Sequence, residues 1–231
     1  MLFRSAWKNH QNGALNPKAQ FRKAVAKETI EKSPKVAGML GVFDCSGVAD
    51  GAAAALMVRA EDVHKYTDTP MYIKALSLTA GTGGGLREST LDFTTFPEVE
   101  QSAREAYAQA GVVDPRKQIA FAEVHDCFTP TELVLMEDLG FSERGNAWRD
   151  VLDGVFDLDG DLPINPDGGL KSFGHPIGAS GLRMLYECWL QFLGRAEDRQ
   201  LDDPRLALTH NLGGQPGECV SFVSIVGKEL G

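Results

Sequence analysis

A glycine-rich loop with a single histidine spans residues 172–181 and reads SFGHPIGASG. Apolar residues then recur at spacings of three and four over residues 182–193, which predicts a helix with one buried face that stops at Gly194. The residues of that expected face are Leu182, Leu185, Tyr186, Trp189 and Leu193. His175 is therefore expected in a tight turn at a helix N-terminus, where glycines allow close backbone approach and free N–H groups favour negative charge. This loop is a candidate site rather than part of the core.

A second stretch, VHDCFTPTE at residues 124–132, marks the end of a buried strand and the start of a helix. The TPTE sequence fits a capping box, with Pro130 at the first helical position. Cys127 precedes this helix start and follows His125 by two residues, surroundings that lower a thiol pKa from its usual value of about 8.5. We expect Cys127 to exchange protons, and the alternative is a buried structural cysteine in the turn.

The third stretch, HNLGGQPG at residues 210–217, is predicted as a glycine loop between strands at residues 206–209 and 219–226. His125, His175 and His210 would then lie in three separate loops at element ends. Convergence of such loops builds sites in α/β folds, so we expect the three histidines to share one site.

The elements around these loops favour a layered α/β architecture in which helices cover a sheet. Further strands are expected at residues 36–43, 71–78 and 119–124, and helices at residues 103–110 and from residue 129, with Gly111 and Gly140 as their stops. Ahead of them, residues 7–17 are predicted as a polar, turn-rich loop, and residues 18–32 as a basic helical stretch.

Composition excludes several classes of protein. The 231 residues are 43% hydrophobic and 24% charged, as expected for a soluble globular protein. No apolar run approaches the roughly 18 residues of a membrane span, and no signal peptide is recognisable, so the cytoplasm is the expected location. The four cysteines form no CxxC pair, which favours free thiols over disulfides or a zinc site.

Charge is unevenly distributed along the chain. The net charge is −9, yet residues 1–35 carry eight Lys or Arg against Glu28 and Glu31, a local balance of +6. A solvated basic surface explains this segment, and the sharper alternative is an anionic ligand. The acidic remainder argues against nucleic acid as a partner.

Two stretches resemble a cofactor motif and a metal-binding motif but do not match either pattern. The GTGGG sequence at residues 81–85 does not match GxGxxG, because Leu86 replaces the last glycine, so dinucleotide binding is not supported. An aspartate series beginning at Asp157 imitates a calcium loop, but its sixth position is Leu162 and its twelfth is Gly168. We expect neither a cofactor nor a metal.

Taken together, VHDCF, GGLKSFGHPIGASG and HNLGG resemble the C-terminal half of a thiolase, as do WKNHQNGALNP at residues 7–17 and SGVADGAAA at residues 46–54. The similarity is to the sterol-carrier-protein-type and related bacterial and archaeal branch. The resemblance implies helices covering a mixed five-stranded sheet, with part of a loop domain. Residues 1–69 would be the end of the N-terminal and loop region, and residues 70–231 the C-terminal thiolase domain.

The resemblance also implies roles for individual residues. His175 would activate a nucleophilic cysteine and help to hold the thioester oxygen, and Cys127 would be the acid/base at the α-carbon of an acyl-CoA. His210 and Asn211 would replace the usual Cys-x-Gly cysteine and contact the thioester, while His125 supports the pocket. The glycines assigned to the same substrate site are Gly174, Gly213 and Gly214. Coenzyme A thioesters would be substrates, with no additional cofactor.

This sequence departs from the family pattern in one respect, because the acyl-enzyme cysteine belongs to the N-terminal half and Cys45 does not correspond to it. The chain is therefore expected to be one half of a truncated or split acyltransferase that is inactive alone. The resemblance further implies a homodimer and a small zinc-ribbon/OB-fold acyl-CoA-binding partner. Two alternatives remain: a retro-aldolase acting on a β-hydroxyacyl-CoA with site tyrosines, for which Tyr186 is a poor match, and a non-catalytic partner-binding subunit.

Overall fold

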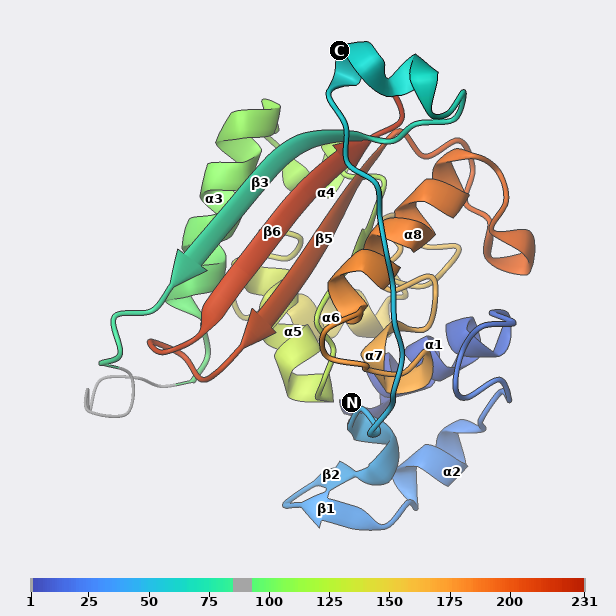
Figure 1. Ribbon diagram of the computed structural model, residues 1–231. Coiled ribbons are helices and arrows are strands. Elements are labelled where there is room, and N and C mark those ends of the chain that lie inside the picture. Colours follow the sequence, from blue (N-terminus) through green and yellow to red (C-terminus); the bar gives the residue numbers. More distant parts are fainter. Residues whose placement is uncertain (1, 85–92, 231) are drawn as a thin grey trace.

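A four-stranded mixed sheet forms the centre of the computed structural model, which describes residues 2–84 and 93–230 (Figure 1). Its strands are β3 (Tyr72–Ala80), β4 (Phe121–Glu123), β5 (Leu206–Gly213) and β6 (Val220–Gly227), in the spatial order β3-β6-β5-β4. The β3/β6 and β5/β6 pairs are antiparallel, and the β4/β5 pair is parallel. The predicted mixed α/β class is confirmed.

The described sheet has four strands rather than the five expected. On the edge of β4 that faces away from β5, the described residues form a single bridge, between Ala122 and Ile164. Asn165 ends this pairing because its backbone has a φ of +54° and its side-chain Oδ1 accepts the Val124 N–H at 2.7 Å, in place of a backbone carbonyl. A side chain therefore substitutes for the next rung of the ladder.

Helices cover both faces of the sheet (Figure 1). Val99, Ala103 and Ala106 of α3 (Pro97–Ala110) pack on one face in a core cluster that also contains Leu135 and Met136 of α5 (Thr129–Asp138). On the other face, residues of α8 (Ser180–Phe192) form a second cluster with strand residues. The members of that cluster include Phe121, Cys188, Phe192, Ala207 and Val226. The predicted stops at Gly111, Gly140 and Gly194 are confirmed by left-handed φ values of 69°, 72° and 67°.

The buried face of α8 differs from the prediction. The buried side chains include Arg183, Met184, Glu187, Cys188, Gln191 and Phe192. The apolar residues expected inside are only partly buried, and Tyr186 is 39% exposed. Apolar periodicity failed because Arg183 and Glu187 have buried ionic partners, which compensate the cost of removing their charges from water.

The N-terminal elements also differ from the prediction. Residues predicted as a polar loop form helix α1 (Leu2–Ala14), while the predicted basic helix is mostly irregular and contains only α2 (Lys27–Glu31). The polar side chains of α1 point inward and find partners: Lys8 bonds Glu132 at 3.1 Å, and Asn9 bonds Asp126 at 2.7 Å. Tertiary hydrogen bonds thus override a sequence that looks like a loop.

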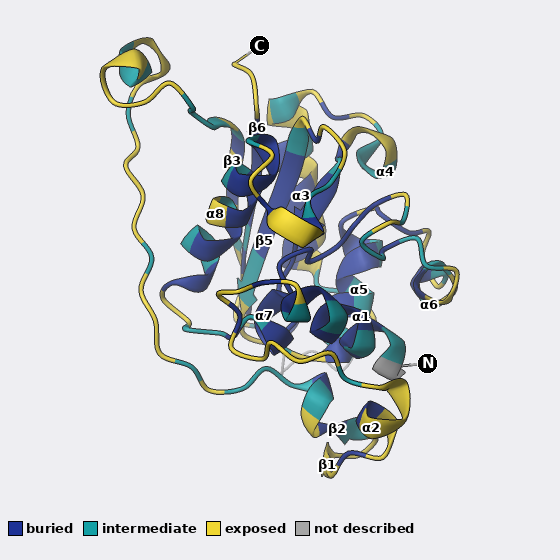
Figure 2. Ribbon diagram, turned by 90° about the vertical axis from the view of Figure 1, so that its right-hand side faces the viewer, coloured by how far each residue is buried: buried dark blue, intermediate teal, exposed yellow. Residues whose placement is uncertain are grey.

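The remaining elements are short. β1 (Lys35–Ala37) and β2 (Leu40–Gly41) form a hairpin, followed by the 3₁₀ turn η1 (Val42–Asp44). Residues 45–59 then run as an extended, mostly exposed segment along the outside of the molecule to η2 (Ala60–Lys65) and β3 (Figure 2). The other short helices are α4 (Pro115–Gln118), α6 (Ala147–Leu152), α7 (Gly169–Ser172) and η3 (Glu197–Arg199). No helix in the described ranges is long and apolar enough to cross a membrane.

Close approach between α1 and α7 requires Gly13. A Cβ placed on Gly13 would lie 2.6 Å from the Cβ of Ser172 in α7. We predict that Gly13→Ala destabilises the fold by about 1–2 kcal/mol, because overpacking outweighs the gain of about 1 kcal/mol in helix propensity. Urea unfolding measures this difference.

The matched control is Gly178→Ala, since no heavy atom lies within 4 Å of its added methyl group. We expect this control to change stability by less than about 0.5 kcal/mol. Equal stability of Gly13→Ala and the wild type would contradict the close packing of α1 on α7.

Candidate active site

One buried carboxylate joins the two loops that the sequence singled out. Asp126, between His125 and Cys127, is fully buried at the end of the chain segment leaving β4. Its Oδ1 accepts the backbone N–H of Leu170 at 2.5 Å, and its Oδ2 accepts Asn9 Nδ2 at 2.7 Å. Leu170 belongs to α7, which leads directly to His175. The Asp126 carboxylate therefore links the Cys127 loop to the segment that leads into the His175 loop.

The segment just after η1 pairs with both loops. The Ser46 N–H donates to the carbonyl of Cys127 at 2.8 Å, beside an antiparallel bridge between Cys45 and Phe128. Two residues further on, Val48 forms a parallel bridge with His175. Three chain segments thus meet at the site, of which the sequence predicted two.

His125 and His175 lie edge to face, with their ring centroids 5.1 Å apart at 87°. His175 Nδ1 is 2.8 Å from Ser180 Oγ, whose hydroxyl donates to the Pro176 carbonyl at 3.1 Å. Because that hydroxyl proton is already used, Ser180 accepts from His175, which places the His175 proton on Nδ1. The neutral ring then presents Nε2 as a bare acceptor.

Burial keeps these imidazoles neutral. It lowers the pKa of His125 to about 4, with a further contribution from His175, against the opposing effects of Asp126 and a hydrogen bond with Asn211. Burial also lowers the pKa of His175, and Asp126 opposes it. Neutral rings are suited to hydrogen bonding and proton transfer near pH 7.

The expected lowering of the Cys127 pKa is wrong. Burial raises the pKa of this thiol, and Asp126 adds to the effect, while a contact with Thr131 and the charge of Lys171 oppose it. Desolvation of the thiolate therefore outweighs the helix start. The thiol therefore keeps its proton near pH 7.

The expected capping box is also wrong, although Pro130 does lie in the first turn of α5. The N-cap position is Phe128, without a side-chain cap. Thr129 instead donates to Asp44 Oδ1 at 2.9 Å, and Glu132 accepts from Lys171 Nζ at 2.8 Å. Buried partners from elsewhere in the chain have displaced the local motif.

His210 and Asn211 lie within β5 rather than in a loop. Successive strand residues face opposite sides of a sheet, so the side chains of His210 and Asn211 point to opposite faces. Asn211 faces α8, where Nδ2 contacts Met184 Sδ at 3.3 Å, and it also bonds His125. His210 is fully buried and bonds Ser221 Oγ at 3.3 Å, on the face covered by α3. Asn211 thus joins the His125 side of the site, and His210 lies behind it.

The three predicted site glycines differ in their surroundings. Gly174 and Gly214 have φ values of +113° and +112°, a region that L side chains rarely adopt. A Cβ on Gly174 would also lie 3.0 Å from Gln20 Oε1, whereas a Cβ on Gly213 would meet no atom within 4 Å. Backbone conformation accounts for Gly174 and Gly214, and contact of the three glycines with a substrate stays a prediction.

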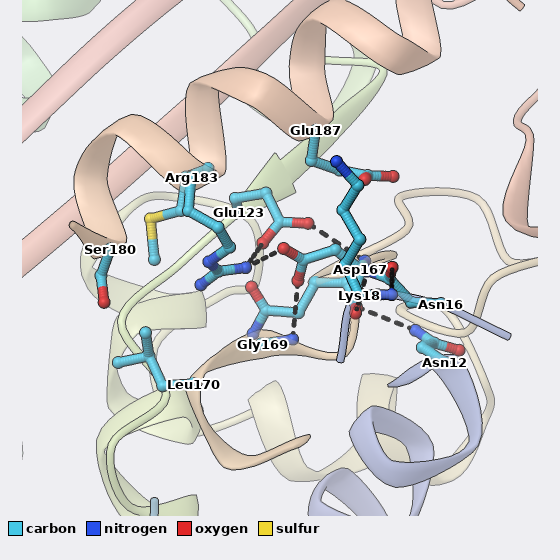
Figure 3. A network of polar contacts seen from close by, with 12 residues as sticks. Asn12, Asn16, Lys18, Glu123, Asp167, Gly169, Leu170, Ser180, Arg183 and Glu187 are labelled. Atoms are coloured by element: carbon cyan, nitrogen blue, oxygen red, sulfur yellow. Dashed lines mark hydrogen bonds and ion pairs between the residues drawn. The ribbon is translucent and has the colours of Figure 1, made fainter. Parts of the chain in front are cut away.

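A second buried network supports the chain ahead of α7 (Figure 3). Arg183 reaches from α8 to Glu123 at 3.3 Å and to Asp167, with which it forms an ion pair. Asn16 donates to the Asp167 carbonyl at 3.0 Å. This network was not predicted from the sequence, although Arg183 lies four residues before Glu187, a spacing that places both on one helix face.

The other three cysteines are differently placed. Cys188 and Cys219 are fully buried, and the Cys45 thiol points to the Gly41 carbonyl at 3.5 Å. Burial, together with Asp44, raises the pKa of Cys45. None of these thiols has the surroundings of an activated nucleophile. In the described part of the chain, no group of His, Cys, Asp or Glu side chains could hold a metal ion.

Comparison with known sequences identifies a family. The profile described as "Thiolase C-terminal domain-like" matches residues 79–225. Acetyl-CoA acetyltransferase of Methanothermobacter thermautotrophicus is 40% identical over 209 residues, which cover 90% of this chain and 54% of that protein. Sterol carrier protein 2 of Bos taurus is 34% identical over 211 residues, covering 90% of this chain and 38% of that protein. The chain therefore spans about half, or less, of the curated relatives it matches.

Solved structures give the same fold. The "Ltp2-ChsH2(DUF35) aldolase" superposes with a TM-score of 0.83 at 25% identity, over 99% of this chain and 58% of that chain. Human mitochondrial 3-ketoacyl-CoA thiolase superposes with a TM-score of 0.64 at 16% identity, over 98% of this chain and 54% of that chain.

The environment of His210 fixes its protonation. Ser102 Oγ donates to the Val99 carbonyl at 3.1 Å and so accepts from Ser221, 2.7 Å away, which leaves Ser221 to accept from His210 Nε2. Burial lowers the pKa of His210 from 6.5 to about 3. We predict a neutral His210 with its proton on Nε2 at pH 6, measurable from imidazole ¹⁵N shifts.

Linkage gives the sign of the accompanying stability change. As the pH falls from 6.5 towards about 3, His210 binds a proton in the unfolded chain but not in the folded protein. The free energy of unfolding therefore decreases over this range. Ser221→Ala should remove the Nε2 preference. Ser224→Ala is the matched control, because its hydroxyl pairs with Thr209 at 2.7 Å instead. A charged His210 at pH 6, or a proton on Nδ1, would contradict this assignment.

Proposed function

The chain belongs to the thiolase family, and on that premise we propose that it carries the acid–base part of a thiolase-type acyltransferase site. The reaction is Claisen condensation of acyl-CoA thioesters or its reverse, the thiolytic cleavage of a 3-ketoacyl-CoA. One observation carries the proposal. Asp126 holds the Cys127 loop against the His175 loop, with His125 and His175 in ring contact.

The geometry suggests a division of labour between the residues. In thiolysis, the carbon–carbon bond electrons move onto the leaving acyl-CoA as an enolate, and the Cys127 thiol gives its proton to the α-carbon. In condensation, the Cys127 thiolate removes that proton. The raised thiol pKa suits the first direction, since the thiol is protonated when the enolate forms. His125 and Asn211 are placed to hydrogen-bond the thioester oxygen.

His175 has a different task in this proposal. Its bare Nε2 is available to take the proton of a nucleophilic thiol, because its Nδ1 proton is held by Ser180. The described thiols do not include that nucleophile, so we propose that it comes from a part of the enzyme outside these residues. We expect the chain alone not to catalyse thiolysis of acetoacetyl-CoA.

The outward face of α8 supports a second unit that covers this half. Leu182 and Trp189 are only partly buried and Tyr186 is 39% exposed, while the opposite face of α8 packs on the sheet. A helix with apolar residues on both faces is suited to a position between two layers. The name of the similar aldolase structure includes a DUF35 protein, and this supports the proposal of a small protein partner for the present chain. The homodimer and the cytoplasmic location stay predictions.

Coenzyme A phosphates are the proposed ligands of the basic N-terminal segment, with one correction. Lys8 is buried against Glu132, and Arg4 pairs with Asp157, so neither is free for a ligand. The exposed cations of this segment are Lys18, Arg22, Lys23, Lys27, Lys32 and Lys35. These six side chains are the ones available to an anion.

Retro-aldol cleavage of a β-hydroxyacyl-CoA is the second candidate, favoured by the TM-score of 0.83 to the aldolase. Tyr186 does not support it. Its hydroxyl lies 3.2 Å from Lys18 Nζ on the exposed side of α8. Release of an aldehyde or ketone from a β-hydroxyacyl-CoA, without turnover of a 3-ketoacyl-CoA, would favour the aldolase.

We predict different defects for Cys127→Ala and His175→Ala in a preparation that contains the acyl-enzyme nucleophile. Cys127→Ala should still form the acyl-enzyme but lose about 10²–10⁴-fold in exchange of α-hydrogens with D₂O, because the α-carbon acid/base is gone. His175→Ala should fail earlier, at acylation. Intact-protein mass spectrometry and deuterium incorporation separate the two steps.

Cys45→Ala is the control, because its thiol points to the Gly41 carbonyl. It should leave both steps unchanged. If Cys127→Ala exchanges deuterium at the wild-type rate, Cys127 is a structural turn residue and the proposed acid–base role is wrong.

A further inference from the structure

A lysine without solvent exposure lies next to the loops of the proposed site. Lys171 is 0% exposed, and its ammonium lies between two buried carboxylates. Nζ is 2.8 Å from Glu132 Oε2 and 3.4 Å from Asp126 Oδ2. The two acids outweigh burial, so that the pKa of Lys171 is raised and the ammonium keeps its charge.

The two carboxylates belong to the segment of the chain that carries Cys127, and Lys171 belongs to the segment that carries His175. Asp126 immediately precedes Cys127, and Glu132 is in the first turn of α5 that follows it. Lys171 stands four residues before His175. The ion pairs of Lys171 therefore cross between the two loops, in parallel with the Asp126–Leu170 hydrogen bond.

The fit between these loops is tight. Gly169 has a φ of +63°, and a Cβ at this position would lie 2.5 Å from Asp126 Oδ2. From the other side, α1 supplies Asn9 to Asp126 at 2.7 Å and Lys8 to Glu132 at 3.1 Å. Burial raises the pKa of Glu132, but Lys171 and Lys8 outweigh it and lower the value to about 2. The cluster is thus buried, and each of its carboxylates has partners.

From this geometry we propose that Lys171 is a positioning residue: its ammonium holds the Cys127 loop and the His175 loop together and supplies the positive charge that the Cys127 thiol experiences. The catalytic meaning of this proposal rests on the acid–base role proposed for Cys127. Lys171 touches no reacting atom and acts through Asp126 and Glu132. Its charge opposes the effect of Asp126 on the thiol pKa.

Two variants change the charges of the cluster in different ways. Glu132→Gln leaves Lys171 with one carboxylate fewer, which makes the surroundings of Cys127 more positive. Lys171→Met combined with Glu132→Gln removes both charges of that pair and leaves Asp126 without its ammonium. Both variants also remove the Glu132 partner of Lys8, which keeps its hydrogen bond to the Ile164 carbonyl at 2.7 Å.

The measurement is the rate of Cys127 alkylation by iodoacetamide against pH in the full 231-residue chain, resolved by peptide mass spectrometry. We expect Glu132→Gln to move the profile to lower pH and to speed alkylation at pH 8 by about threefold. The double variant should move it to higher pH and slow alkylation by about threefold or more. Circular dichroism establishes that each variant is folded.

The matched control is another buried ion pair, Arg199 with Glu187 at 2.9 Å on the inner side of α8. Arg199→Met with Glu187→Gln should alter stability without moving the Cys127 profile. An unchanged profile in Glu132→Gln would overturn the proposal, even if the double variant does not fold. An equal shift in the Arg199 control would overturn it as well, because the effect would then be general destabilisation.

Alkylation needs no acyl-CoA, so this result is independent of the proposed reaction. If the profiles shift as expected but α-hydrogen exchange in the complete enzyme does not follow them, the acid–base role of Cys127 fails and the Lys171 contacts stand. If exchange follows the profiles, both are supported.

Discussion

A carboxylate without access to water must find all its partners inside the protein, and the rest of this structure is arranged around that requirement at Asp126. Leu170 N–H, Asn9 and Lys171 satisfy it. Asn9 brings α1, and Leu170 and Lys171 bring α7, to the end of β4. The α1 helix, the one-turn α7 and the Cys127 loop therefore assemble as a unit, and His175 follows directly from α7.

Burial also decides the electrostatics of the site. A thiol at a helix start is expected to ionise readily, yet desolvation dominates at Cys127 and raises its pKa. The same effect holds His125 neutral near pH 7. A protonated thiol is suited to returning a proton to carbon, whereas a permanently ionised thiol would first have to acquire one.

Local signals in the sequence were sufficient for much of the fold and for finding the loops of the site. Apolar runs and glycine stops predicted β3, α3 and the start of α8, and the glycines around His175 and the HDCF motif marked the two loops that Asp126 joins. These features depend on neighbours in the chain. Their combination also carried the family resemblance, which the match over residues 79–225 confirms.

The errors arose where the deciding partner is distant in sequence. The polar residues of α1 resemble a loop until Asp126 and Glu132, more than a hundred residues away, are placed beside them. The buried face of α8 was predicted wrongly because Arg183 pairs with Glu123 inside the protein. The capping box was predicted wrongly because the Thr129 hydroxyl bonds Asp44 instead. His210 was misplaced because β5 extends four residues beyond its apolar run.

We propose that Cys127, His125 and His175 share one site for an acyl-CoA thioester. A crystal structure with acetyl-CoA bound tests it most directly. We expect the thioester oxygen to lie within about 3 Å of a ring nitrogen of His125 or His175, with the α-carbon facing Cys127 Sγ. A thioester bound away from these rings, or an α-carbon turned away from Cys127, would contradict it.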